Sequence, residues 1–193
     1  MEKEFIIHDE TGTLEYYPSF LKNTHQLFHT LSHELEWSKP SIKIFGKTHP
    51  IPREQAFYGD KGLSYKYSGT IFPTIDWNES LKLIKTQLEK IQGDRFNCVL
   101  CNLYSKGGDY MSLHSDNEPE LGPEPIIASA SLGETRIFHI QTKDKSKKQD
   151  IELKDGDVLF MRGKFQEYWN HGIKKTARDK KPRINLTYRY IFS

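Results

Sequence analysis

The sequence predicts a mainly β protein: a double-stranded β-helix, or jelly-roll, core buttressed by two N-terminal helices. Two segments in the first half carry apolar side chains at helical spacing. After Gly93, about eight short runs of strand-forming residues are joined by glycines and charged turns. No repeat or linker interrupts the 193 residues. We therefore expect a single domain over residues 1–193, with a largely helical part at about 1–93 and the jelly-roll core at about 94–193.

Asn23 is expected to cap the first helix, over Thr24–Glu36. Its apolar residues recur at the spacing of one buried face: Leu27, Phe28, Leu31 and Leu35. Three histidines also recur every four residues: His25, His29 and His33. This spacing is compatible with a metal site, but the histidines lie away from the apolar face. A solvent-exposed face is the favoured interpretation.

The second helix is predicted over Trp77–Ile91, with Gly93 just past its end. Between the helices, from Ile42 to Tyr67, strand formers alternate with turn residues, and aromatic side chains stand beside basic ones. Such residues either pack in a core or stack on and bind nucleotides. Composition alone favours the core, and the nucleic-acid alternative stays open.

The second half of the chain is predicted to consist of strands. They are expected at Phe96–Tyr104, Tyr110–Ser115, Ile126–Ser131, Thr135–Gln141, Asp150–Leu153, Asp157–Arg162, Glu167–His171 and Arg183–Phe192. The first of these contains both cysteines, Cys98 and Cys101. A redox pair of this spacing starts a helix, and a zinc site needs further ligands, so we interpret them as buried structural cysteines.

The overall charge says little about partners, whereas the apolar pattern argues against a membrane-spanning or secreted protein. The net charge is only +2, with basic runs at 143–148 and 174–183 and an acidic run at 116–124. No apolar run approaches the ~18–20 residues needed to span a membrane. The first residues lack the basic and apolar regions of a secretory signal. We expect an intracellular protein without a membrane partner, in the cytoplasm or, in a eukaryote, the nucleus.

A candidate metal site lies where the second predicted strand ends. His114 and Asp116 are two residues apart, so in a strand both side chains point to the same face. Together with a distant histidine they would form the facial triad of two histidines and one carboxylate that holds Fe(II) in non-haem oxygenases. His171 is the best third candidate. The short motif is weak by itself.

The final strand adds a candidate anion site. Alternation puts four polar side chains on one of its faces: Arg183, Asn185, Thr187 and Arg189. Either this face meets solvent, or it lines a cavity that holds an anion, because unpaired buried charges are costly. Arginine suits a carboxylate. Asn102 and Tyr104 share a face of their own strand and are expected to reach the same cavity.

These pieces, in this order, resemble the AlkB family of Fe(II)/2-oxoglutarate-dependent dioxygenases. The similarity runs from about Ile42 to Arg189. The motifs that carry it are Asn102-x-Tyr104, His114-x-Asp116-x-Glu118, Pro125-Ile126, Ser129-x-Ser131-Leu132-Gly133, Gly156-Asp157, Trp169-x-His171 and Arg183-x-Asn185-Leu186-Thr187-x-Arg189. Upstream, Phe45-Gly46-Lys47, Pro52-Arg53-x-Gln55 and Tyr58-Gly59-Asp60 are similar to the branch that repairs double-stranded DNA.

The resemblance implies a DNA dealkylase. Fe(II), held by His114, Asp116 and His171, would use O2 and 2-oxoglutarate to hydroxylate the N-methyl group of 1-methyladenine or 3-methylcytosine, with release of formaldehyde. The residues expected to bind 2-oxoglutarate are Asn102, Tyr104, Arg183, Asn185, Thr187 and Arg189, with Arg189 on its distal carboxylate. Residues 1–93 would then hold the nucleotide-recognition part.

The resemblance also implies contacts to a flipped base in duplex DNA. Phe45 would fill the gap left in the duplex. The expected substrate-binding residues are Phe45, Gly46, Lys47, Arg53, Tyr58, Tyr65, Lys66, Tyr67, Asn117 and Glu118. Lys174, Lys175 and Arg178 would bind DNA phosphates, although a solvated loop is an alternative. We expect a monomer. The competing hypotheses are an AlkB-type dioxygenase acting on RNA or protein, a non-catalytic nucleic-acid-binding module, and a jelly-roll oxygenase of sugars or small molecules.

Overall fold

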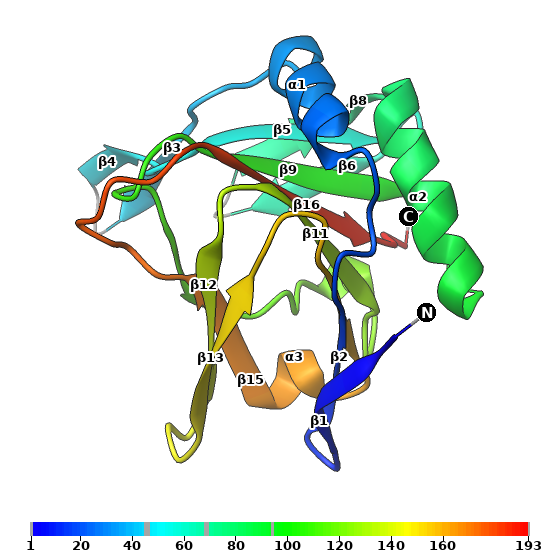
Figure 1. The fold of residues 1–193 in the computed structure, drawn as a ribbon, viewed down its shortest axis with the longest axis vertical. Coiled ribbons are helices and arrows are strands. Elements are labelled where there is room, and N and C mark those ends of the chain that lie inside the picture. The colour runs from blue at the N-terminus through cyan, green and yellow to red at the C-terminus, as the bar shows by residue number, and fades with distance from the viewer. Residues whose placement is uncertain (1, 45–46, 68–69, 94, 193) are drawn as a thin grey trace.

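The computed structural model describes residues 2–44, 47–67, 70–93 and 95–192; the side chains of 42–48 and 64–73 and of Gln92 lie outside this description. Antiparallel sheets dominate, as predicted (Figure 1). The main sheet has the order β1-β2-β14-β11-β16-β9-β5-β8. Its strands are β1 (Glu4–Asp9), β2 (Gly12–Tyr17), β14 (Val158–Arg162), β11 (Ile127–Gly133), β16 (Arg183–Arg189), β9 (Cys98–Tyr104), β5 (Glu54–Gly59) and β8 (Ile75–Asp76).

A smaller sheet faces the main one and completes the jelly roll. It has the order β10-β15-β12-β13. Its strands are β10 (Met111–His114), β15 (Trp169–Ile173), β12 (Arg136–Thr142) and β13 (Lys148–Leu153). Two separate hairpins pair β3 (Ser41–Ile44) with β4 (Lys47–Pro50) and β6 (Ser64–Tyr67) with β7 (Thr70–Pro73). Short helices η1 (Pro119–Leu121) and α3 (Phe165–Tyr168) precede β11 and β15.

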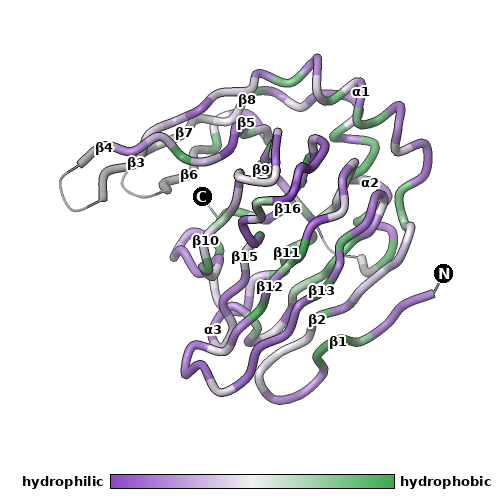
Figure 2. Tube along the Cα trace, turned by 60° about the vertical axis from the view of Figure 1, so that its left-hand side comes forward, coloured by the Kyte–Doolittle hydropathy of each residue, from purple (hydrophilic) through white to green (hydrophobic). Residues whose placement is uncertain are grey.

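The period-two alternation of the strands produces two cores. On β14, Val158 and Phe160 point to the cluster beneath the long helices, whereas Leu159 and Met161 point to the cluster between the two sheets. Parts of β11 and β12 are correspondingly hydrophobic along the chain trace, and many of the turns are hydrophilic (Figure 2). The cavity described below therefore lies inside the jelly roll, between two packed layers.

Both long helices form as predicted and lie over one side of the main sheet (Figure 1). α2 (Glu79–Gln92) is capped at its N-terminus by Asn78, whose side chain accepts hydrogen bonds from Ser80 N and Leu81 N. Its C-terminal cap is Gly93, with φ 73°. α1 (Thr24–Glu34) ends two residues earlier than expected. Asn23 occupies the predicted N-cap position, but its backbone is left-handed, with φ 55°, and its side chain makes no capping hydrogen bond.

The expected division near residue 93 does not match the sheets. Four strands from the first part, β1, β2, β5 and β8, belong to the main sheet beside strands from the second part. β2 pairs with β14, which places Tyr17 opposite Val158. Sequence patterns identify strands but carry little information about such distant pairing. The N-terminal part is therefore built into the core sheet. None of the helices in the described ranges is long and apolar enough to cross a membrane.

The two cysteines are buried free thiols, as predicted. Burial raises the pKa of Cys98 to about 12 and also raises the pKa of Cys101. Because the thiolate is the reactive form, we expect neither cysteine to react with a disulfide reagent in the native protein at pH 8, and both to react after unfolding in guanidinium chloride. The number of protein thiols that react in the native and in the unfolded state tests this expectation. Rapid reaction of one native thiol would contradict it.

Candidate metal centre and the cavity beside it

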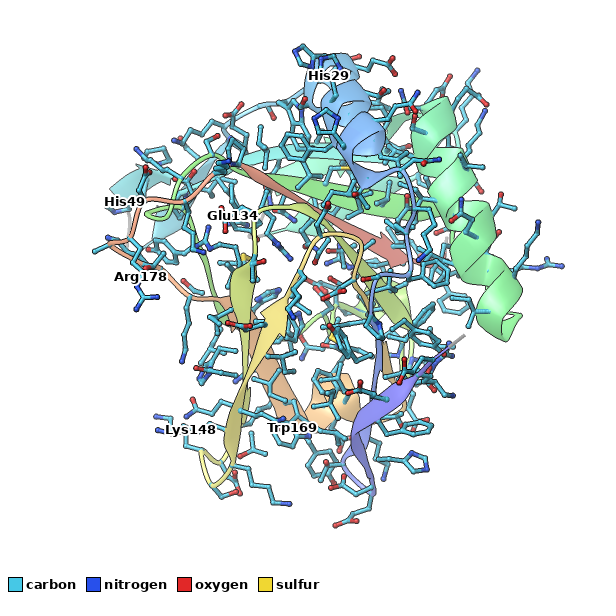
Figure 3. All side chains as sticks on the ribbon, in the orientation of Figure 1. His29, His49, Glu134, Lys148, Trp169 and Arg178 are labelled. Atoms are coloured by element: carbon cyan, nitrogen blue, oxygen red, sulfur yellow. The ribbon has the colours of Figure 1, made fainter. Side chains whose placement is uncertain are left out.

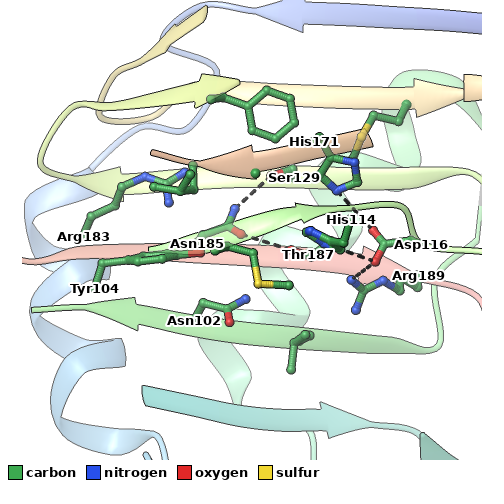
Figure 4. A pocket seen from close by; sticks show the side chains of 16 residues that line it. Asn102, Tyr104, His114, Asp116, Ser129, His171, Arg183, Asn185, Thr187 and Arg189 are labelled. Atoms are coloured by element: carbon green, nitrogen blue, oxygen red, sulfur yellow. Dashed lines mark hydrogen bonds and ion pairs between the residues drawn. The ribbon is translucent and has the colours of Figure 1, made fainter. Parts of the chain in front are cut away.

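Three side chains from two strands meet at one end of the jelly-roll interior. β10 and β15 pair so that His114 lies opposite His171, and Asp116 follows just after β10. One ligand atom from each residue lies within 4.8 Å of the other two. His114 Nε2 is 3.9 Å from Asp116 Oδ1, and His171 Nε2 is 3.7 Å from Asp116 Oδ2 (Figure 4). The predicted triad is thus brought together.

The protonation states of these residues suit a metal. Burial, together with the proximity of His114, lowers the pKa of His171 to about 3, so its ring is neutral at pH 7. Burial acts to raise the pKa of Asp116, but Arg189, His171 and His114 outweigh it, and the pKa lies below its usual value. Asp116 Oδ2 is buried without a hydrogen-bond partner in the described part of the chain. A neutral imidazole and a carboxylate with a spare oxygen are what Fe(II) requires.

Neighbouring groups orient the ligands. His114 Nδ1 lies 2.9 Å from the carbonyl oxygen of Ser112, which turns Nε2 toward Asp116. The backbone N–H of Asp116 donates to Gln166 Oε1 at 2.9 Å, and Gln166 is itself buried on α3. The sequence did not indicate Gln166, because a lone glutamine in a one-turn helix has no recognisable pattern.

The polar face of β16 lines a cavity that extends from the triad. All four predicted residues, Arg183, Asn185, Thr187 and Arg189, are buried and line it. The solvent-face alternative is therefore wrong. Neighbouring strands hold this face by hydrogen bonds: Arg183 Nη2 donates to Ser131 Oγ at 2.9 Å, and Asn185 Nδ2 donates to Ser129 Oγ at 2.8 Å.

The two arginines occupy opposite ends of the cavity (Figure 4). Arg189 Nη2 lies 2.8 Å from Asp116 Oδ1, at the metal end. Arg183 lies at the other end, with its guanidinium carbon 5.4 Å from the centre of the Tyr104 ring. Arg189, expected on the distal carboxylate of 2-oxoglutarate, is thus paired with Asp116 at the metal end. The end remote from the triad is occupied by Arg183, which could bind a carboxylate there.

Arg183 has unused capacity for an anion. Burial lowers the pKa of its guanidinium to about 10, so it remains charged at pH 7. Its Nε and Nη1 atoms are buried without a hydrogen-bond partner among the described residues. A buried cation with two unsatisfied donors is unfavourable without a ligand and well suited to a carboxylate.

Asn102 and Tyr104 also line this cavity, as predicted. Arg53 Nε and Gln55 Nε2 donate to Asn102 Oδ1 at 2.8 Å and 2.9 Å, which leaves the amide N–H groups of Asn102 as donors. Arg53, expected to contact substrate, is buried and holds Asn102 through this hydrogen bond. It also lines a groove outside the triad. That groove is lined by His49, Pro50, Ile51, Pro52, Arg53, Tyr110, Met111, Ser112, Leu113 and His114.

The remaining predicted substrate residues fall into three groups. Tyr58 lies in the core beneath the helices, where its hydroxyl accepts a hydrogen bond from Glu36 N, so its expected substrate contact is wrong. Asn117 is exposed, and Glu118 follows the triad with a buried Oε2 atom that has no hydrogen-bond partner in the described ranges. Phe45 and Gly46 lie outside the described residues, as do the side chains of Lys47, Tyr65, Lys66 and Tyr67.

The basic loop, residues 174–181 between β15 and β16, lies at the surface. Lys174 Nζ pairs with Asp150 Oδ2, so its charge is already compensated. Lys175 and Arg178 are exposed. Arg178 and His49 lie at the same side of the molecule (Figure 3). The basic loop therefore stands on the side where the groove is lined by His49.

The fold and the site define a class of protein: a jelly-roll metalloenzyme with a two-histidine, one-carboxylate centre beside a carboxylate-binding cavity. The family model of the 2OG-Fe(II) oxygenase superfamily matches residues 13–189. The chain belongs to this superfamily. The name of this superfamily agrees with the three residues that could hold Fe(II), His114, Asp116 and His171.

Similar proteins confirm the predicted resemblance to the AlkB family. The alpha-ketoglutarate-dependent dioxygenase alkB homolog 3 of Bos taurus is 36% identical over 182 residues, which cover 89% of this chain and 63% of that protein. The DNA oxidative demethylase ALKBH2 of Mus musculus is 34% identical over 177 residues, which cover 86% of this chain and 74% of that protein. This chain thus spans less than two thirds of the bovine relative. The solved structure of OsALKBH1 is similar in fold, with a TM-score of 0.70 at 17% identity, and the match covers 97% of this chain and 100% of that one.

Proposed function

We propose that this enzyme removes N-linked methyl groups from bases in DNA. The observation that carries the proposal is the groove outside the triad, which is lined by the metal ligand His114 and lies on the side of the exposed basic loop. A substrate held there reaches the metal centre while its backbone remains near positive charge. The names of the similar DNA oxidative demethylases agree with this substrate class.

His114, Asp116 and His171 would hold the iron, and Arg183 would bind the distal carboxylate of 2-oxoglutarate. When bound, the iron supplies oxidation of the N-methyl carbon by O2 while 2-oxoglutarate is converted to succinate and CO2. Asn102 donates toward the cavity from its amide, and Arg189 holds the Asp116 carboxylate in place at 2.8 Å. The hydroxymethyl group formed on the base then leaves as formaldehyde.

Glu118 supports a cationic lesion as the substrate. Its Oε2 atom is buried without a hydrogen-bond partner in the described part of the chain, two residues after the ligand Asp116. 1-Methyladenine and 3-methylcytosine carry a positive charge that a nearby carboxylate stabilises. A neutral base does not gain this interaction, so we propose these two lesions as substrates.

We propose that duplex DNA is the form acted on, with Phe45 filling the gap left by the flipped base. A wedge of this kind offsets part of the unstacking cost of a few kcal/mol. We propose that it acts as a monomer: in the described part of the chain, the candidate metal ligands and the cavity are complete within one copy, so the proposed activity needs no second one. DNA as substrate supports an intracellular location, in the cytoplasm or in a nucleus.

The test uses a duplex oligonucleotide with one 1-methyladenine, incubated with enzyme, Fe(II), ascorbate and 2-oxoglutarate. We expect the mass to fall by one methylene unit, only when 2-oxoglutarate is present and not with His171→Ala. Succinate without a mass change would overturn DNA demethylation and direct the search to RNA or protein. The same lesion in a single strand and the variant Phe45→Ala test strand preference. If Phe45→Ala leaves both activities unchanged, the duplex proposal fails.

A further inference from the structure

A further buried arginine, Arg136, lies behind the cavity wall and is assigned no role by the triad or the proposed substrate contacts. It begins β12, and only 2% of its surface is exposed. Burying a guanidinium is costly unless its donors are satisfied. Its position therefore calls for partners, and these partners identify what the residue holds together.

The side chain of Arg136 donates hydrogen bonds to backbone carbonyls of two loops. Three acceptors belong to the 105–110 loop between β9 and β10: Nη1 donates to Lys106 O at 3.3 Å, and Nη2 donates to Gly107 O at 3.3 Å and to Asp109 O at 2.7 Å. The fourth acceptor is Lys174 O, at 2.8 Å, where the basic loop begins. One guanidinium thus bridges the two loops.

The two loops also contact each other directly. Thr176 N donates to Gly107 O at 3.0 Å. A Cβ atom on Gly107 would lie 2.2 Å from Arg178 O, so no side chain fits there without displacement of the basic loop. The far end of the basic loop is held by Glu134, which accepts a hydrogen bond from Lys180 Nζ at 2.9 Å. The turn before β12 and the first residue of β12 therefore anchor both ends of this loop.

Arg136 also packs against a residue that lines the cavity, Tyr104. Its guanidinium carbon lies 5.6 Å from the centre of the Tyr104 ring, and that of Arg183 lies 5.4 Å from the same ring. Tyr104 is buried at the end of β9, immediately before the 105–110 loop. A cation against an aromatic ring restricts the ring when both are buried. The position of Tyr104 beside Arg183 therefore depends on Arg136.

We propose that Arg136 is a positioning residue that fixes two parts of the site at once: Tyr104 at the distal end of the 2-oxoglutarate cavity and the basic loop at the surface. The DNA side of this inference rests on the proposed function, whereas the 2-oxoglutarate side rests on the membership of the superfamily. Because one side chain holds both, its loss weakens the binding of co-substrate and of duplex together.

The test compares Arg136→Met with Arg136→Lys, Gly107→Ala and the control Arg162→Met. Arg162 lies on β14, where its Nε atom is 3.7 Å from Glu15 Oε2. Three quantities are measured: the Kd of 2-oxoglutarate for the Mn(II)-loaded protein by calorimetry, the rate of tryptic cleavage within the basic loop by mass spectrometry, and the Kd of a duplex oligonucleotide by fluorescence anisotropy. None of them requires turnover.

For Arg136→Met we expect about tenfold weaker 2-oxoglutarate binding, equivalent to ~1.4 kcal/mol, because Tyr104 is no longer held in place. We also expect faster cleavage of the basic loop and weaker duplex binding. Arg136→Lys is expected to give values between those of Arg136→Met and of the wild type in all three measurements. Gly107→Ala should change loop cleavage and duplex binding and leave 2-oxoglutarate binding within twofold. Arg162→Met should change none of the three.

Unchanged 2-oxoglutarate binding or unchanged loop cleavage in a folded Arg136→Met protein would overturn the proposal, even if its Tm falls. If Arg136→Met does not fold, Arg136→Lys decides: values equal to those of the wild type in all three measurements overturn it. If the wild type does not bind duplex, the proposed DNA substrate fails separately, because calorimetry and tryptic cleavage still report on Arg136.

Discussion

His171→Ala is expected to abolish Fe(II) binding and, with it, all 2-oxoglutarate-dependent oxidation. His171 provides one of three ligand atoms that lie within 4.8 Å of one another. Loss of a group that hydrogen-bonds to a metal ligand already lowers metal affinity by ~10–100-fold. Loss of a ligand itself should therefore lower the affinity by more than ~100-fold. The measurement is the anaerobic visible charge-transfer band of the Fe(II)–2-oxoglutarate complex, titrated with Fe(II).

His33→Ala is the matched control, because this exposed histidine on α1 lies outside the site. It should keep the band and the activity of the wild type. Asp116→Ala should also lose the metal but is expected to lower Tm further, since removal of one partner of a buried ion pair costs ~3–5 kcal/mol. Tight Fe(II) binding by His171→Ala would show that the metal is held elsewhere.

Arg183→Met is expected to weaken 2-oxoglutarate binding by ~100-fold or more. Each hydrogen bond to a charged group contributes ~1.5–3 kcal/mol, and 1.4 kcal/mol is a factor of ten. Arg183 offers two buried donors that have no partner among the described residues. The KM for 2-oxoglutarate in succinate formation, and its Kd for the Mn(II)-loaded protein, measure the loss.

The same substitution should not lower the Tm of the protein without co-substrate. Methionine removes a buried charge at the cost of one hydrogen bond to Ser131. Added 2-oxoglutarate should raise the Tm of the wild type but not of the variant, because a ligand stabilises only the state that binds it. Arg162→Met serves as the control for KM and for the rise in Tm on addition of 2-oxoglutarate. A KM close to that of the wild type in Arg183→Met would contradict the assignment of Arg183 to the distal carboxylate.

Two of the three candidate metal ligands were predictable because their information is local, whereas His171 had to be chosen from a distant part of the chain. His114 and Asp116 are two residues apart, and the polar face of β16 follows from alternation alone. The same rule separates residues on β5. Gln55 and Phe57 face the interior of the jelly roll, whereas Ala56 and Tyr58 face the helices. Application of the alternation to β5 would have excluded Tyr58 from the substrate site.

Other features depend on contacts between distant segments and could not be predicted. The sequence does not specify which arginine of β16 lies at the metal end. That depends on where the segment after β10 crosses the sheet. Arg136 resembles any charged residue at the start of a strand, although its partners are carbonyls of residues 106–109 and 174. The pairing of β2 with β14 is likewise a long-range property.

The strand order of the main sheet has a consequence for biosynthesis. β16 lies between β11 and β9 at the middle of the sheet, although it is the last of the described strands along the chain. During translation, β9 and β11 must each wait with an unpaired edge until β16 has left the ribosome. Pairing between strands that are far apart in the sequence forms slowly. Until it forms, the unpaired strand edges of the nascent chain are prone to aggregation. We expect closure of the jelly roll only after β16 emerges, with chaperones bound to the nascent chain until then.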